Sequence, residues 1–210
     1  SFNRMHEDGY FEQSLNIYSS VSLEPTVLNI EGEIHYFTEV QGNNIEGLYE
    51  GITDWADYDN DGDLDFIIAG RTSSWNVKYT RVYQNFGNNS FVYLPSTPFS
   101  GVSNGSTSWG DYDNDGDLDV LLTGSQYSSP SNISRIYKNL GNGNFSLLTD
   151  LYGMSLSEGE WADFDNDGDL DILISSNYYG TKLYKNEGND IFTEMADLGF
   201  PNNGGAIDWG

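Results

Sequence analysis

The hydrophobic positions of this chain occur in short runs rather than in helical stripes. Three-residue apolar runs stand at 66–68, 120–122 and 172–174, and small residues follow each of them. Runs this short predict buried strands, because a helix needs a longer periodic segment. Further segments alternate apolar and polar residues. They centre on Tyr83, Tyr137 and Tyr184, and then on Phe91, Phe145 and Phe192. The pattern predicts an all-β fold.

The chain also repeats itself. The segment 55–65 recurs at 109–119 and at 161–171, each time beginning with Trp, and a further Trp stands at 209. Repeats near 50 residues with about four strands each are typical of β-propeller blades. The sequence therefore predicts four units, at 1–53, 54–107, 108–159 and 160–207, and the start of a further repeat at 208–210. The first unit is divergent, with Phe2 in the Trp position.

Three units carry a nine-residue loop with Asp at positions 1, 3, 5, 7 and 9 and Gly at position 6. Carboxylates at 1, 3, 5 and 9, with a backbone carbonyl at 7, form an oxygen cage that suits calcium better than magnesium. The Gly permits the turn that curls the loop around an ion. The acids expected to hold three calcium ions are Asp57, Asp59, Asp61, Asp63, Asp65, Asp111, Asp113, Asp115, Asp117, Asp119, Asp163, Asp165, Asp167, Asp169 and Asp171.

Two other interpretations of the loop fit less well. A solvated acidic turn would not keep a fixed Gly and a fixed Leu anchor in three copies. An EF-hand requires Glu at position 12, where this chain has Ile68, Leu122 and Ile174. In the first unit Arg4 and His6 replace the first two acids of the loop, so we expect no calcium there.

The net charge of the chain excludes some classes of partner. The 210 residues include 33 acidic and 8 basic side chains, for a net charge of −25, and no Cys. This balance excludes a nucleic-acid interface and an anionic membrane surface as partners. No apolar run is long enough to span a bilayer, so we expect no membrane insertion. Calcium sites of extracellular modules have dissociation constants of about 10⁻⁴–10⁻³ M. Cytosolic calcium is too scarce to fill sites of this affinity, so we expect an extracellular, secreted or cell-surface location.

These motifs resemble the FG-GAP/VCBS repeats of bacterial surface proteins and the related calcium-bearing blades of integrin α-subunit propellers. The resemblance implies that each acidic loop joins the first and second strands of a blade. It also implies a closed propeller of about seven blades. Four units fall short of that number, so ring closure would need more chain, a partner or an open array.

The connections between the second and third strands vary most from unit to unit. They carry Trp75, Tyr127, Tyr178 and Tyr179 among small polar residues. In an up-and-down blade these connections lie on the face opposite the calcium loops. Their aromatic rings suit stacking on a sugar or contact with a protein, although they could also simply pack over blade edges. The Trp at 55, 109 and 161 recurs in register and is expected in the core.

The sequence offers little for catalysis. Its two His lie in the divergent first unit, and calcium cages account for its paired carboxylates. We therefore expect no enzyme, and predict a calcium-binding module for adhesion or for recognition of a protein or carbohydrate ligand. A structural subunit of a calcium-stiffened extracellular fibre or surface assembly is the alternative. A further alternative is a non-catalytic part of a polysaccharide lyase.

Overall fold

The computed structural model describes residues 10–17, 26–33, 45–74, 77–87 and 90–195. The chain divides into two units, Ser1–Gln41 and Gly42–Gly210. In the first unit the described residues form one antiparallel pair, β1 (Tyr10–Ile17) with β2 (Thr26–Glu33). The altered loop with Arg4 and His6 lies outside the described residues. Across the described ranges, no helix is long and apolar enough to cross a membrane.

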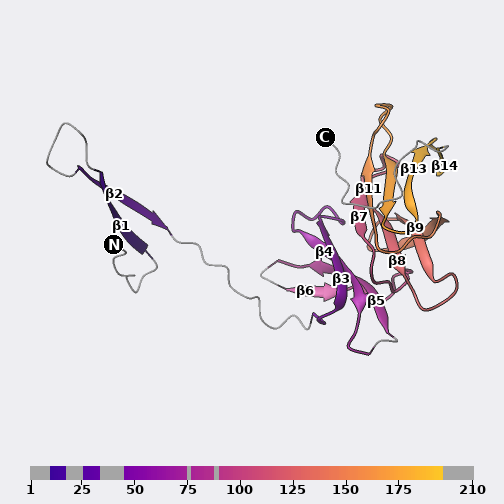
Figure 1. The fold of residues 1–210 in the computed structure, drawn as a ribbon, viewed down its shortest axis with the longest axis horizontal. Coiled ribbons are helices and arrows are strands. Elements are labelled where there is room, and N and C mark those ends of the chain that lie inside the picture. The colour runs from indigo at the N-terminus through magenta and orange to yellow at the C-terminus, as the bar shows by residue number, and fades with distance from the viewer. Residues whose placement is uncertain (1–9, 18–25, 34–44, 75–76, 88–89, 196–210) are drawn as a thin grey trace. The chain divides into compact units, whose positions relative to one another are not determined.

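The second unit contains three four-stranded antiparallel sheets, in which each strand pairs with its neighbours in chain order (Figure 1). The first sheet comprises β3 (Tyr49–Ala56), β4 (Asp65–Arg71), β5 (Lys78–Asn85) and β6 (Phe91–Tyr93). The second comprises β7 (Thr107–Gly110), β8 (Asp119–Ser125), β9 (Asn132–Asn139) and β10 (Phe145–Asp150). The third comprises β11 (Ser157–Ala162), β12 (Asp171–Ser176), β13 (Gly180–Asn186) and β14 (Phe192–Glu194). These sheets confirm the all-β prediction and are consistent with propeller blades.

The three apolar runs form the second strand of each sheet, as predicted. The middle sheet shows why β8 is apolar at consecutive positions instead of alternating. Val120 and Leu122 are buried in the core shared with the first sheet, whereas Leu121 is buried in the core shared with the third. A strand covered on both faces needs apolar residues on both, which produces a continuous run.

A repeated aromatic stack fixes how neighbouring sheets pack. Tyr58 stacks on Trp109 with ring centroids 5.9 Å apart and an interplanar angle of 14°. Tyr112 stacks on Trp161 in the same way, at 6.0 Å and 11°. Each pair joins the residue after a loop's first Asp to the Trp of the next repeat. The same contact therefore positions the loops at 57–65 and 111–119 against the sheets that follow them.

Trp55 differs from its two counterparts. Its ring packs on Phe66 and Phe91 within the first sheet, but 53% of the residue is exposed. The expectation of a core position was therefore wrong for this Trp. The reason is that Gly42–Gly210 has no described sheet before the first one, so no Tyr from a preceding repeat stacks on Trp55.

Candidate metal centres

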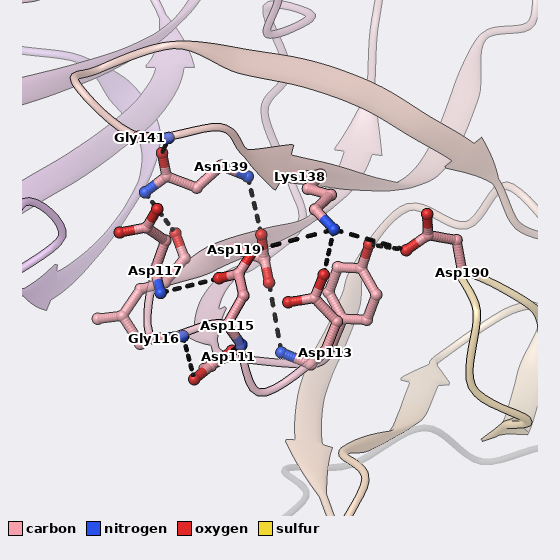
Figure 2. Close-up of polar contacts among 12 residues, drawn as sticks. Asp111, Asp113, Asp115, Gly116, Asp117, Asp119, Lys138, Asn139, Gly141 and Asp190 are labelled. Atoms are coloured by element: carbon pink, nitrogen blue, oxygen red, sulfur yellow. Dashed lines mark hydrogen bonds and ion pairs between the residues drawn. The ribbon is translucent and has the colours of Figure 1, made fainter.

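Each acidic loop connects the first strand of its sheet to the second, as the resemblance implied. We call residues 57–65 the first loop, 111–119 the second and 163–171 the third. In the second loop, the two carboxylate oxygens of Asp111 accept hydrogen bonds from the backbone N–H groups of Asp115 and Gly116, both at 3.0 Å (Figure 2). The first and third loops close identically, also at 3.0 Å. The first Asp therefore shapes the turn.

Two residues of each loop have left-handed backbone. The Asn at position 4 has φ of 58–60° in all three copies. The Gly at position 6 has φ of 92–97°. Asn tolerates the first conformation, and Gly is favoured for the second because a Cβ there would be strained. These two residues let the turn curl so that its acidic side chains converge.

The carboxylates converge in three groups, each able to hold a metal ion. In every group the ligand oxygens lie within 4.8 Å of one another. The groups are Asp57, Asp59 and Asp61; Asp111, Asp113 and Asp115; and Asp163, Asp165 and Asp171. All ligand atoms are carboxylate oxygens, which are the donors preferred by hard divalent cations.

One carboxylate oxygen in each of the first two groups favours a cation directly. Asp59 Oδ1 and Asp113 Oδ1 are buried and have no hydrogen-bond partner. A buried, unpaired carboxylate oxygen is costly, and a bound cation would satisfy it. Burial also raises the pKa of Asp59, with the charges of Asp61 and Asp57 adding to the effect. The residues present therefore fit a metal ion.

The ninth acid of each loop is fully buried and anchors the loop to its own sheet. Asp119 accepts hydrogen bonds from the backbone N–H of Tyr112 at 3.3 Å and of Asn139 at 2.8 Å. Asp65 and Asp171 make the equivalent pairs. Burial raises the pKa of Asp119 to about 7 and that of Asp65 to about 6, and it raises the pKa of Asp171 in the same direction. Of these three acids, Asp171 belongs to a metal group.

The acids at positions 5 and 7 are connected through the backbone. In the second loop, the N–H of Asp117 donates to Asp115 Oδ1 at 3.0 Å, and the other loops repeat this bond. The side chains of Asp63, Asp117 and Asp169 lie outside the three groups of converging carboxylates. So does that of Asp167, whose carboxylate faces a lysine.

A side chain from the third strand lies beside each group, and the sequence analysis did not identify it. Lys138 contacts Asp113 and lies 3.9 Å from Asp115 (Figure 2). Lys185 likewise contacts Asp165 and Asp167, whereas Gln84 donates to Asp59 in the first loop. The recurring Tyr-[Gln/Lys]-Asn motif carried the signal, because the residue after each Tyr faces the loop. The second and third loops thus each have a lysine beside them, whereas among the described residues the first loop has Gln84 in that position.

Asp190 is a second residue that the sequence analysis missed. It lies between β13 and β14 of the third sheet and accepts a hydrogen bond from the Tyr112 hydroxyl at 2.6 Å. Its carboxylate is also 3.8 Å from Lys138 Nζ (Figure 2). The second loop therefore has an acidic neighbour from the third sheet.

The aromatic residues expected to bind a ligand have different surroundings. Tyr127 is 54% exposed beside the Lys78 ammonium, which lies 4.7 Å from the ring centroid. Tyr178 is 75% exposed at the turn between β12 and β13, and Tyr179 accepts a hydrogen bond from Asn132 at 2.7 Å. Trp75 lies outside the described residues. The exposed rings are available for contact, but they do not form one cluster.

A cavity of about 570 Å³ lies near the ends of the strands that are remote from the loops. Its lining includes Ile52 and Thr53 in the middle of β3, the starts of β7 and β11 and the end of β12, so all three sheets contribute. Most of the lining groups are hydroxyls and amides. Its polar residues are Thr53, Asn104, Ser106, Thr107, Ser157, Glu158, Ser175 and Asn177.

Comparison with known families agrees with the repeat pattern. A model of the FG-GAP-like repeat matches residues 57–122, 111–174 and 163–210. The match gives three repeats instead of the four expected, and residues 1–53 lie outside it. No curated protein matches the chain.

Proposed function

Because the chain belongs to the FG-GAP-like repeat family, we propose that it is an extracellular recognition module stabilised by three calcium ions, one in each acidic loop. One observation carries the proposal. Three loops of identical backbone geometry bring carboxylates together, and in two of them a buried carboxylate oxygen lacks any partner. Calcium accepts several oxygen ligands in flexible geometry, which matches a loop of five Asp better than the strict octahedron of magnesium does.

Calcium has a structural role in this proposal. The acids at positions 1, 3 and 5 would supply side-chain oxygens in the first and second loops, and Asp163, Asp165 and Asp171 would supply them in the third. The bound ion would neutralise carboxylates that otherwise repel one another on a chain of net charge −25. With dissociation constants of about 10⁻⁴–10⁻³ M, millimolar calcium would add about 1–1.5 kcal/mol of stability per site.

The proposal includes further blades of the same kind. The outer face of the first sheet carries Trp55, Phe66, Tyr83 and Phe91 in mutual ring contact. In the next two sheets the corresponding face is covered by the preceding repeat through the Tyr–Trp stack. The exposed ring of Trp55 therefore supports packing of another blade on this face, as in a larger propeller.

Recognition is assigned to the face opposite the loops. The cavity on that side is lined by neutral hydroxyl and amide groups with one acid, Glu158, and the exposed ring of Tyr178 follows its lining residue Asn177. Polar groups that hydrogen-bond hydroxyls, next to a flat aromatic ring, suit a carbohydrate. We therefore favour a glycan ligand over a protein one. The proposed role is binding without catalysis.

Glycan-array binding of the full chain in millimolar calcium tests the recognition role. We expect one class of glycan to bind, and Tyr178→Ala to weaken it. Tyr93→Ala is the matched control, since Tyr93 is an exposed ring on β6 away from the cavity. Binding that is equally strong in Tyr178→Ala would refute the assigned surface, and the absence of any glycan ligand would refute the carbohydrate class.

The exposed Trp55 of the first sheet also favours the alternative of a structural subunit. Static light scattering in calcium and after chelation distinguishes the two roles. A small particle of constant mass supports the recognition module. Particles that grow in calcium and dissociate on chelation would support the fibre or surface assembly instead.

A further inference from the structure

The asparagine at position 4 of a loop reaches the loop of the next repeat. Asn60 Nδ2 donates a hydrogen bond to the carbonyl oxygen of Gly116 at 3.1 Å. Asn114 Nδ2 donates to the carbonyl oxygen of Gly168 at 3.2 Å, and to Asp169 Oδ1 at the same distance. Both acceptor carbonyls belong to the Gly whose N–H is held by the first Asp of its own loop. Neighbouring loops are therefore in direct contact.

A second set of hydrogen bonds runs in the opposite direction. Asn139 Nδ2, at the end of the third strand of the second sheet, donates to the carbonyl oxygen of Tyr58 in the first loop at 3.3 Å. Asn186 Nδ2 makes the equivalent bond to Tyr112 at 2.9 Å. The backbone N–H of Asn139 is itself held by Asp119, the buried acid of the second loop. Each loop thus contacts its neighbour through two separate paths.

Backbone conformation alone does not account for the position-4 Asn. Gly adopts the same left-handed φ equally well, although it has no side chain to form hydrogen bonds. Asn60 and Asn114 add an amide that bonds across the repeat boundary. Asn166 has the same loop position and a φ of 60°, but within the described residues its amide makes no hydrogen bond to a further loop. Asn166 is therefore a natural control within this chain.

We infer that Asn60 and Asn114 couple the three loops, so that a cation bound in one loop favours binding in the next. The inference rests on the proposed calcium function. In the second loop a bound ion would fix Asp111 and Asp115, and these acids hold the backbone on both sides of the position-6 carbonyl. In the third loop it would fix Asp163, which holds the N–H of the position-6 Gly. In both loops the position-6 carbonyl is the acceptor for the preceding Asn. Because coupling between sites is reciprocal, the preceding loop is ordered by the same contact.

The size of the coupling follows from the contact. The net strength of an ordinary hydrogen bond corresponds to about a two- to tenfold change in the binding constant of the neighbouring site. Electrostatics would oppose this coupling at low salt, because a filled loop carries less negative charge and therefore attracts calcium to its neighbour less than an unfilled loop does. High salt screens such interactions between exposed charges, whereas a short hydrogen bond persists.

The test replaces Asn with Gly, which keeps the left-handed backbone and removes only the amide. The full chain is titrated with calcium at high salt in competition with a chromophoric chelator. We expect a steep curve for the wild type and a shallower one for Asn60→Gly/Asn114→Gly, with three ions bound in both. Asn166→Gly should behave as the wild type does. Circular dichroism in saturating calcium verifies folding, and the single variant Asn114→Gly replaces the double one if that protein does not fold.

The outcomes separate the two proposals. Equal steepness in the double variant and the wild type would overturn the coupling and leave the calcium function standing, as would an equal loss in Asn166→Gly. A wild-type chain that takes up no calcium would overturn the proposed function and the coupling with it.

Discussion

Replacing Asp113 by Asn should separate metal binding from folding in the second loop. Asp113 Oδ1 is buried without a partner, and Oδ2 faces Lys138. Asp111 differs, because both of its oxygens hold backbone N–H groups of the turn. Asp113 therefore serves the metal site, whereas Asp111 serves both the site and the shape of the loop.

The structure gives the expected size of each effect. In chelator, Asp113→Asn removes one of five neighbouring negative charges but also loses the ion pair with Lys138, so these opposing effects should change the free energy of unfolding by less than about 1 kcal/mol. In millimolar calcium the variant should lose the stabilisation of one site, about 1–1.5 kcal/mol. Asp111→Asn should cost about 1–2 kcal/mol even in chelator, because one turn N–H loses its acceptor.

Urea unfolding followed by tryptophan fluorescence, in chelator and in millimolar calcium, measures these differences. Asp117→Asn is the matched control. It makes the same charge change in the same loop, but its carboxylate lies outside the converging group. If calcium stabilises Asp113→Asn as much as the wild type, or if Asp117→Asn loses as much as Asp113→Asn, the assignment of Asp113 as a metal ligand is refuted.

Three further predictions concern pH and packing. Because burial raises the pKa of Asp65 to about 6 and that of Asp119 to about 7, above the ordinary 3.8, the folded state binds protons that the unfolded chain releases. In chelator the free energy of unfolding should therefore rise as pH falls from about 7 to about 4, and urea titrations at several pH values check this sign. Trp161→Ala should cost about 3–5 kcal/mol in the same assay, since it removes the stack on Tyr112 and a hydrogen bond to Ser108. Gly110→Ala should cost about 1–3 kcal/mol, because its Cβ would lie 2.7 Å from the Trp161 ring; a stability equal to the wild type would contradict that packing.

Much of the repeat could be predicted from the sequence because its local signals are strong. The apolar run 120–122 predicted β8, and the segments around Tyr137 and Phe145 predicted β9 and β10. The Asp spacing with Gly116 predicted a loop between strands, with carboxylates on one side. Each of these features depends on neighbours within a few residues in the chain.

Other features depend on contacts between repeats, and sequence periodicity does not contain them. Trp55 has the same local pattern as Trp109, but its exposure is decided by whether a preceding sheet supplies a Tyr. The role of Lys138 depends on the pairing of β8 with β9, which places its ammonium beside Asp113. Asp119 was expected to be a metal ligand. The structure shows that both of its oxygens accept hydrogen bonds from backbone N–H groups and that it lies outside the converging carboxylates of its loop, which spacing alone did not reveal.

The number of calcium ions bound per chain tests the central claim most directly. Equilibrium dialysis of chelator-treated protein against millimolar calcium, with and without excess magnesium, gives that number. The account predicts three ions per chain, one for each group of converging carboxylates, retained in the presence of magnesium. No uptake, or complete displacement of calcium by the excess magnesium, would contradict it.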